Sequence, residues 1–158
     1  MFLRIGLFLL LACLLPQSAN AAGSKKGKAS ITFHLQAEKG DAPKMIYPMM
    51  VGGNQVAFKR MPEISTKDIA AYKAIPSKEK DGVYDIVVQL KPNAAKRLQM
   101  ITNAHRGRFM TSQLNGRTGD AMMINQQVDD GMLVIWGVAT AEDLKTIAKA
   151  FKGSVEID

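Results

Sequence analysis

Few side chains in this sequence could carry out catalysis or hold a metal ion. The chain has one cysteine, Cys13, and two histidines, His34 and His105. The histidines stand far apart, and neither has a glutamate or a second histidine at the three- or four-residue spacing of a helical zinc site. We therefore predict that both histidines are structural and that the protein holds no metal ion.

The other candidates for chemistry are residues that commonly form turns. Asp129 and Asp130 lack the alternating acidic residues of a calcium-binding loop, so we expect them to form a turn. Gly52 and Gly53 are not followed by the helix start that a phosphate-binding loop requires. The sequence also has no Gly-x-Ser-x-Gly motif for a hydrolase nucleophile. We predict a protein without enzymatic activity and without a cofactor.

Methionine is the unusual feature of the composition. The chain has 10 methionines, including the adjacent pairs Met49–Met50 and Met122–Met123. In a strand, one member of each pair must face away from the core side. Flexible thioether side chains suit surfaces that accept varied apolar segments. We hypothesise that Met49, Met50, Met122 and Met123 contribute to a groove for unfolded polypeptide or a partner loop; ordinary core filling is the alternative.

The composition is that of a basic globular protein. The 158 residues carry 21 Lys and Arg against 14 Asp and Glu, a net charge of +7, and 47% of them are hydrophobic. These values exclude a collagen-like or disordered chain. Arg106, Arg108 and Arg117 could form a basic patch, but few aromatic residues lie nearby for a nucleic-acid stacking surface. We expect a solvated basic face and no nucleic-acid partner.

Residues 1–21 have the pattern of a cleavable secretory signal. Arg4 precedes an apolar run over 5–15, and Ala19-Asn20-Ala21 is typical of a cleavage site. We predict cleavage between Ala21 and Ala22, followed by a flexible basic leader over 22–29. Because the apolar run is shorter than the roughly 20 residues of a membrane-spanning helix, we expect a periplasmic or secreted protein without a stable membrane span.

Cys13 lies in a segment, Leu10-Leu11-Ala12-Cys13, that loosely resembles a lipoprotein box. Apolar residues continue after the cysteine, where a lipoprotein usually becomes polar, so we do not expect lipid anchoring at Cys13. Cleavage after Ala21 would remove the only cysteine. The mature chain would then depend on its apolar core for stability, since no disulfide could form.

Residues 30–158 are expected to form one domain. Alternating apolar and polar residues predict a strand over 30–37, and 55–60 suit another. Residues 45–54 contain a proline and suit an irregular loop or a short edge segment. The sequence leaves open whether residues 22–60 join the main sheet.

The middle of the chain offers two helix starts. Ser65-Thr66-Lys67-Asp68 has a capping-box pattern and predicts a short helix that ends at Pro76. A strand is predicted over 83–90. Pro92 then stands at the start of a second helix, which ends before Gly107.

The last part of the chain continues the alternation of strands and helices. Asn115-Gly116 predicts a hairpin turn, and the apolar run over 132–136 predicts a buried strand. Thr140 to Asp143 form a capping box for a helix, and 155–157 suit a final strand. The order from residue 83 is close to a ferredoxin-like split β-α-β arrangement with an extra hairpin strand. We predict an α+β fold with helices on one face of a mainly antiparallel sheet.

Several motifs occur in the order and at the spacing of a known domain. They are Glu63-Ile64-Ser65-Thr66-Lys67-Asp68-Ile69, Val83–Leu90, Asn93-Ala94-Ala95, Ile101-Thr102-Asn103, Gly107-Arg108, Leu114-Asn115-Gly116-Arg117, Met123-Ile124, Gly131, Ile135-Trp136-Gly137 and Ala141-Glu142-Asp143. Through this series, residues 60–153 resemble the periplasmic head domain of SecD, a subunit of the bacterial protein-export accessory complex SecDF. The Leu114–Arg117 turn stands where that family has an Asp-Gly-x-Val turn.

The sequence departs from the family in two respects. Gly119-Asp120-Ala121-Met122 lacks the proline that usually follows the family turn. SecD also has several membrane helices, and this sequence shows no membrane segment beyond its signal. The resemblance therefore implies the binding role of a SecD head and not its proton-driven movement.

Two functions are consistent with the sequence. The resemblance implies an exported, non-enzymatic binding module that contacts newly translocated or unfolded polypeptide, or an envelope partner. The alternative is a structural or assembly domain of a periplasmic complex unrelated to export, because one fold can serve different functions. Contact with many unfolded clients would favour the first function, and a single stoichiometric partner the second.

Overall fold

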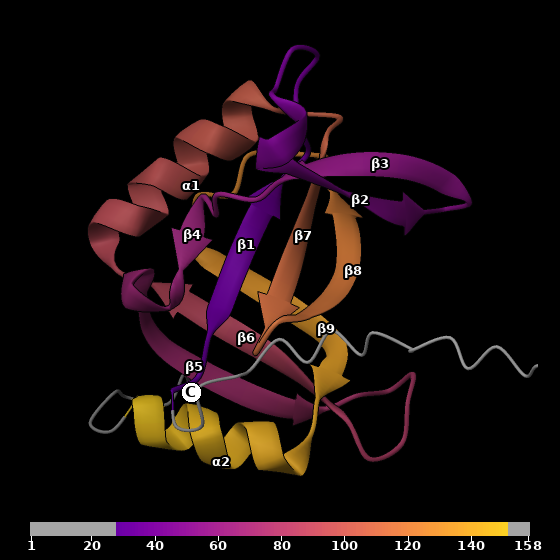
Figure 1. Cartoon of the computed structure of the whole chain (residues 1–158). Helices are drawn as coiled ribbons and strands as arrows, with labels where there is room; N and C mark the ends of the chain where they lie inside the picture. The colour runs from indigo at the N-terminus through magenta and orange to yellow at the C-terminus, as the bar shows by residue number, and fades with distance from the viewer. Residues whose placement is uncertain (1–27, 152–158) are drawn as a thin grey trace, which may run out of the picture.

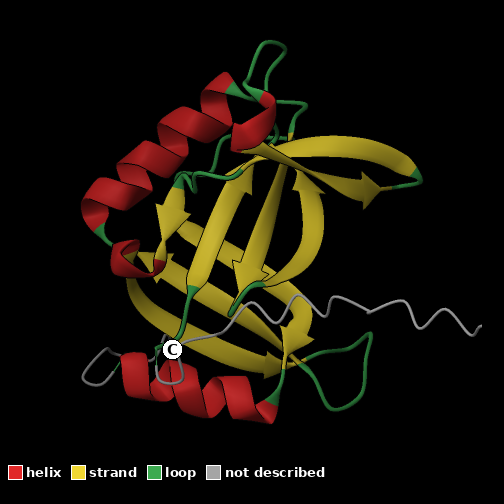
Figure 2. Ribbon diagram, viewed as in Figure 1, coloured by secondary structure: helices red, strands yellow, loops and turns green. Residues whose placement is uncertain are grey.

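The computed structural model describes residues 28–151. Within that range, Figure 2 shows short strands connected by loops and two α-helices. The strands are β1 (Ile31–Leu35), β2 (Ile46–Val51), β3 (Asn54–Lys59), β4 (Ile64–Ser65), β5 (Ile69–Pro76), β6 (Tyr84–Leu90), β7 (Phe109–Leu114), β8 (Arg117–Met123) and β9 (Met132–Ala139). The helices are α1 (Pro92–Ala104) and α2 (Ala141–Ala150), and two 3-10 turns are η1 (Pro43–Met45) and η2 (Thr66–Asp68).

The strands form three antiparallel sheets. One sheet has the order β4-β1-β7-β8, a second has the order β5-β6-β9, and β2 pairs with β3 alone. In Figure 1 the first two sheets cross each other, and the β2–β3 hairpin projects from one end as an arm. The predicted α+β class with antiparallel pairing is confirmed. We expected the strands to share one sheet, and they do not. β1 pairs with β7 over five residue pairs and so keeps the β7–β8 hairpin apart from β6.

The segment before residue 60 contributes to the fold in two ways. The predicted strand over 30–37 is confirmed as β1, which lies inside the four-stranded sheet between β4 and β7. Of the two alternatives for residues 45–54, the short edge segment is observed and the irregular loop is not, since these residues form β2 and the turn into β3. Pro48 is tolerated there because β2 has a hydrogen-bonded neighbour, β3, on one side only.

One apolar cluster joins the two larger sheets and both helices. Alternate residues of β6, Ile86 and Val88, are fully buried. Tyr72 on β5 is paired with Val88, and its ring lies 5.5 Å from that of Phe151 at the end of α2. Since paired residues share a face of the sheet, α2 covers the face that carries the buried residues of β6. Leu98 on α1 belongs to the same cluster.

Helix α1 begins and ends as the sequence predicted. Pro92 occupies its first turn, where the missing N–H costs no hydrogen bond. Ala94, Leu98 and Thr102 recur four residues apart and are buried, so they form the stripe that faces the core. The helix ends at Ala104, before Gly107, and the chain turns into β7.

The prediction of a short helix over 65–76 is wrong. The capping box at Ser65 and Asp68 is present, but it supports a single 3-10 turn, η2, and the chain then continues as β5. Short helices are marginal without tertiary packing, whereas β5 gains a long antiparallel pairing with β6. That partner lies downstream, so no local pattern could reveal it.

The predicted hairpin, last strand and last helix of the described range are present. Asn115 and Gly116 alone form the hairpin turn, with φ of 51° and 80°. This left-handed pair is typical of a type I′ turn. β9 extends to Ala139, and its residue Trp136 is 46% exposed, so the apolar run is not buried throughout. The signal at 1–21 and the strand at 155–157 lie outside the described residues.

A buried carboxylate clamps this hairpin to α2. Asp143 caps α2 by accepting hydrogen bonds from the Thr140 N–H (2.8 Å) and hydroxyl (2.7 Å). It also accepts from the Asn115 amide (2.7 Å) and from the Arg117 guanidinium. The Asn115 side chain in turn accepts from the Ser30 N–H, just before β1. The turn, the start of β1 and the start of α2 are therefore held at one point.

The partners of Asp143 keep it ionised. Burial by itself would raise the pKa of this carboxyl. The hydrogen bonds from Thr140, Arg117 and Asn115 outweigh burial, and the pKa is lowered below its ordinary value. Because the folded pKa is depressed, the clamp stabilises the fold above the unfolded value of about 3.9 and is lost as the pH falls through the folded pKa.

We expect Asp143→Asn to lower the free energy of unfolding at pH 7 by about 2 kcal/mol, because the amide cannot accept all four hydrogen bonds. The difference from the unsubstituted protein should shrink as the pH falls below about 4. Urea unfolding at several pH values measures it. Asp120→Asn is the matched control, since Asp120 is exposed and has no ion pair among the described residues. A loss that is the same at every pH would contradict the electrostatic role of Asp143.

Gly131, directly before β9, gives a second test of the fold. Its φ is +68°, and an added Cβ would lie 2.7 Å from the Ala95 Cβ on α1. We expect Gly131→Ala to destabilise the protein by about 2–4 kcal/mol, because backbone strain and overpacking add. Gly82 has a φ of +75° but no heavy atom within 4 Å of an added Cβ, so Gly82→Ala should cost only about 1 kcal/mol. Equal losses in urea unfolding would mean that the contact with α1 is unimportant.

Candidate functional site

A pocket lined mainly by methionine and aliphatic side chains lies between the ends of β8 and β9. It encloses about 410 Å³, which is within the roughly 300–1,000 Å³ of typical ligand sites. Its apolar walls include Met110, Met122, Met123, Ile124, Met132 and Leu133. We call it the methionine pocket. None of its lining residues is ionisable.

The two main sheets position the walls of this pocket. β8 is the edge of the four-stranded sheet and β9 is the edge of the three-stranded sheet. Three polar residues line the pocket, Thr102 on α1, Asn125 and Gln126, and the buried Thr102 is satisfied internally. Its hydroxyl donates to the Leu98 carbonyl (2.9 Å) and accepts from the Val128 N–H (2.9 Å). The pocket can therefore offer apolar contact without leaving this buried hydroxyl unpaired.

Two of the four methionines singled out in the sequence line the methionine pocket. Met122 is partly buried, and its sulfur lies 3.3 Å from the indole nitrogen of Trp136 on β9. Met123 is 49% exposed at the mouth. Both residues therefore line the same pocket, although neighbours in a regular strand alternate between its faces.

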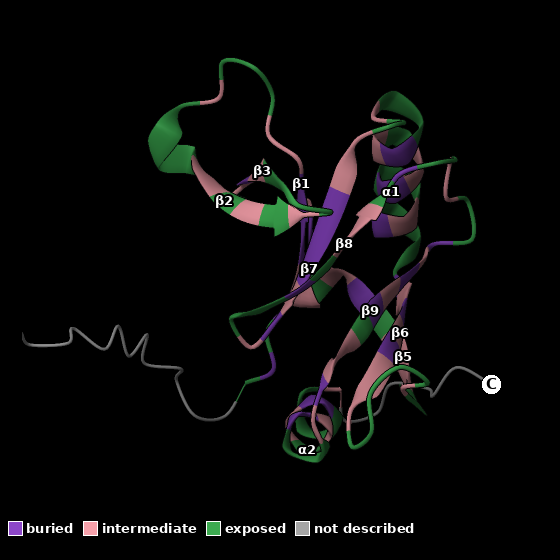
Figure 3. Ribbon diagram, turned by 90° about the vertical axis from the view of Figure 1, so that its right-hand side faces the viewer, coloured by how far each residue is buried: buried purple, intermediate pink, exposed green. Residues whose placement is uncertain are grey.

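The other two lie on β2 of the arm and are not among the lining residues. Met49 faces the four-stranded sheet, where its sulfur is 3.7 Å from the hydroxyl of the buried Thr111. Met50 is 63% exposed. Figure 3 shows the arm extending away from the remainder of the described chain, with only limited burial along it. The structure therefore places the two pairs on different parts of the surface.

An aromatic cluster fixes the base of the arm. The ring of Tyr47 lies 5.8 Å from His34 and 6.0 Å from Phe58. His34 bonds through Nδ1 to the Lys59 carbonyl (2.9 Å) and through Nε2 to the Thr32 hydroxyl (2.8 Å). Burial lowers the pKa of His34, and the Lys59 carbonyl only partly opposes this. His34 is therefore a neutral packing residue at neutral pH.

The second histidine lies elsewhere. The Nδ1 of His105 is 3.9 Å from the Glu38 carboxylate, which also pairs with Arg108 at 3.4 Å. Across residues 28–151, no group of three or more His, Cys, Asp or Glu side chains is placed to hold a metal ion. Within the same range, no helix is both long and apolar enough to cross a membrane.

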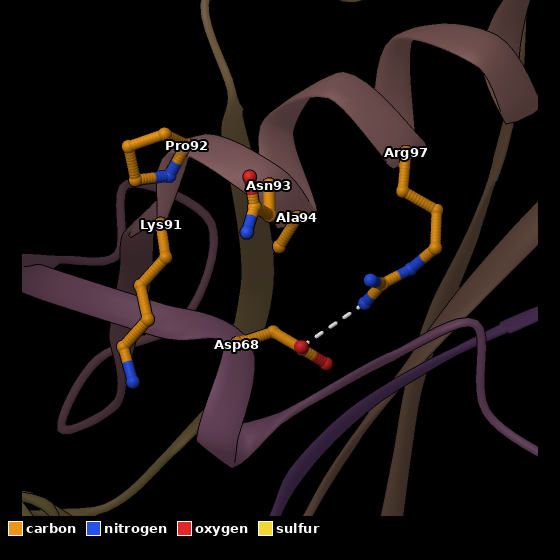
Figure 4. Close-up of a pocket in the computed structure, with 6 residues that line it drawn as sticks. All are labelled: Asp68, Lys91, Pro92, Asn93, Ala94 and Arg97. Atoms are coloured by element: carbon orange, nitrogen blue, oxygen red, sulfur yellow. Dashed lines mark ion pairs between the residues drawn. The ribbon is translucent and has the colours of Figure 1, made fainter.

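A second pocket, of about 530 Å³, lies at the start of α1 (Figure 4). Its charged groups pair with the protein itself. Arg97 contacts the Asp68 carboxylate at 3.0 Å, and the Lys91 ammonium donates to the Lys67 carbonyl at 2.7 Å. Burial would raise the pKa of Asp68, but hydrogen bonds from Ser65 and Arg97 outweigh it and lower the pKa. These contacts join the start of α1 to η2.

Sequence reasoning missed two of the four methionines that line the pocket. Met110 and Met132 stand alone in the sequence, and each lines the methionine pocket from a different strand. Trp136, in the run predicted as a buried strand, is partly exposed and contacts the lining residue Met122 without lining the pocket itself. A local signal existed only for Met132, which follows a turn and begins a strand. The meeting of β7, β8 and β9 depends on pairings between distant segments.

The basic residues near the hairpin also have separate roles. Arg117 binds Asp143 and donates to the Val138 carbonyl at 3.1 Å. Arg108 pairs with Glu38, and Arg106 donates to the Asn103 amide oxygen at 3.2 Å. Each of the three guanidinium groups therefore contacts a different part of the protein.

No sequence-family model and no curated protein sequence matches this chain. Solved structures of SecDF do match its fold. One is a structure of SecDF described as a membrane component that enhances protein export, with 17% identity, a TM-score of 0.55, and coverage of 80% of this chain and 63% of that chain. Another is SecDF in a super-membrane-facing form, with 18% identity, a TM-score of 0.54, and coverage of 80% and 19%.

The chain therefore spans less than two thirds of either SecDF chain. At these identities the likeness concerns the fold. The resemblance that the ordered sequence motifs predicted is confirmed at that level: the described part of this chain has a fold similar to the head domain of SecDF.

Proposed function

We propose that this protein is an exported, non-enzymatic binding module that holds apolar stretches of translocated or unfolded polypeptide in the methionine pocket. The observation that carries the proposal is the pocket itself. It is uncharged, and four methionines line it from three strands, namely Met110, Met122, Met123 and Met132. Thioether side chains adapt to partners of different shape, which suits a surface that must accept many sequences.

The likeness to SecDF supports the same role. SecDF enhances protein export, and a domain of similar fold could meet polypeptide that emerges on the far side of the membrane. Fold alone does not decide function, so the proposal depends on the chemistry of the pocket. The likeness is consistent with the proposed setting, in which the protein meets unfolded segments with exposed apolar side chains.

The projecting arm supports the alternative, a structural or assembly domain. Among the large hydrophobic residues of β2 and β3, Met50 is the most exposed, at 63%. A projecting hairpin of this kind could dock into one fixed partner in an envelope complex. The two functions use different surfaces, so substitutions can separate them.

We expect Met122→Ser/Met123→Ser to weaken capture of a permanently unfolded, carboxymethylated polypeptide about tenfold, because apolar contact area in the pocket is lost. Met49→Ser/Met50→Ser is the matched control and should leave capture unchanged. Fluorescence anisotropy with the labelled polypeptide measures both affinities, and urea unfolding verifies that both variants are folded. Equal affinities for the unsubstituted protein and both variants would show that the pocket is not the binding site. A loss confined to the arm variant would place polypeptide binding on the arm instead of the pocket.

The proposed export gives a separate prediction. Mass spectrometry of the protein recovered from the cell envelope should find Ala22 at the N-terminus, since Ala19-Asn20-Ala21 suits a signal peptidase. A diacylated Cys13 at the N-terminus would instead indicate a lipoprotein. Recovery from the cytosol with residues 1–21 intact would contradict export.

A further inference from the structure

The methionine pocket lies where the edge strands of two sheets come together. Within residues 28–151, β8 has a ladder partner only in β7, and β9 only in β6. The two strands run close to each other at their other ends, where the Arg117 guanidinium donates to the Val138 carbonyl at 3.1 Å. At the pocket end, side chains line a cavity instead of closing the gap. The edge strands of a sheet carry unpaired N–H and C=O groups that can bind an added strand.

The register shows which backbone groups face outward. The Gly131 carbonyl accepts from the Leu90 N–H (2.9 Å), and Leu133 is paired with Val88. Because backbone groups alternate along a strand, Gly131 and Leu133 face β6, and the N–H and C=O of Val134 face away from it.

The same argument applies to β8. The Ile124 N–H donates to the Arg108 carbonyl and the Ile124 carbonyl accepts from the Gly107 N–H, both at 2.8 Å. Ile124 therefore faces the β7 side, and Met123, one residue earlier, directs its backbone groups outward. Met123 and Val134 both line the methionine pocket, so free hydrogen-bonding groups stand at its rim on two sides.

The charges beside the pocket define the occupant further. Asp129 and Asp130 immediately follow the lining residue Val128, and the Asp130 carboxylate accepts from the N–H of Met132 at 2.9 Å. Both aspartates are exposed, and neither forms an ion pair within residues 28–151. This local negative charge stands out in a chain with a net charge of +7. It would attract a basic side chain and repel an acidic one.

We propose that the methionine pocket binds its client as an added β-strand. The occupant is an extended apolar segment of polypeptide that carries a lysine or arginine at one end. Its backbone hydrogen-bonds to the outward groups of Met123 and Val134, its apolar side chains fill the pocket, and its basic group lies at Asp129 and Asp130. This inference rests on the proposed function and specifies the sequence and conformation that the site selects.

The test uses four synthetic peptides with one apolar core, Val-Leu-Val-Leu. One ends in Lys-Lys, one in Gln-Gln and one in Glu-Glu, and the fourth is the Lys-Lys peptide N-methylated at alternate residues. We expect the Lys-Lys peptide to bind about tenfold more tightly than the Glu-Glu peptide, and about tenfold more tightly than its N-methylated form, which has lost backbone donors. Amide NMR spectra of the ¹⁵N-labelled protein should show shifts at Met123 and Val134.

Two variants locate the charge preference. Asp129→Asn/Asp130→Asn should remove the difference between the Lys-Lys and Glu-Glu peptides and leave the affinity for the Gln-Gln peptide unchanged. Glu79→Gln/Asp81→Asn in the exposed β5–β6 loop is the control for the same change in net charge, and it should preserve the difference.

The outcomes separate this inference from the proposed function. Binding that is insensitive to N-methylation and to the end charges, but is weakened by Met122→Ser/Met123→Ser, would overturn the added-strand mode and leave the binding module intact. Failure of all four peptides and of the unfolded polypeptide to bind would overturn both.

Discussion

The structure depends on a division of strands between two sheets that share one core. The pairing of β1 with β7 holds the β7–β8 hairpin in one sheet, and the pairing of β6 with β9 fixes the other. Neither sheet can bury its apolar face alone, so the two cross over a common cluster that also takes in Leu98 and Ile147 from the helices. As a consequence, β8 and β9 are edges that meet without forming a ladder, and the methionine pocket occupies the place where they separate.

Two similar polar devices hold this arrangement. Asp68 and Asp143 each cap a helical turn within a capping box, and each binds an arginine from another element, Arg97 and Arg117 respectively. The local motif supplies the hydrogen bonds that keep the carboxylate charged, and the arginine uses that charge to join distant segments. The first device ties η2 to α1, and the second ties α2 to the β7–β8 turn. None of these four charged residues lines the methionine pocket.

The likeness to SecDF and the chemistry of the pocket support the proposed function in different ways. The fold similarity, at 17–18% identity, places the described residues in a known architecture. The pocket is a property of this chain's own side chains, and it supplies the adaptable apolar surface that a binding module needs. The proposed function gives a role to the methionines that line the pocket from separate strands and none to the adjacent pair on the arm.

The sequence by itself determined the elements whose signals are local. Pro92 at a helix start, Asn115-Gly116 in a two-residue turn and the capping box of α2 each lie within a few residues of the structure that they specify. Only the tertiary structure decided how these elements combine. It made residues 69–76 a strand through a downstream partner, and it divided the strands into separate sheets. It also gathered Met110, Met122 and Met132 around one cavity and left Met49 and Met50 outside its lining. Strand pairing joins residues that are far apart in the chain, and its free energy depends on which partners are available, so no window of sequence contains the information.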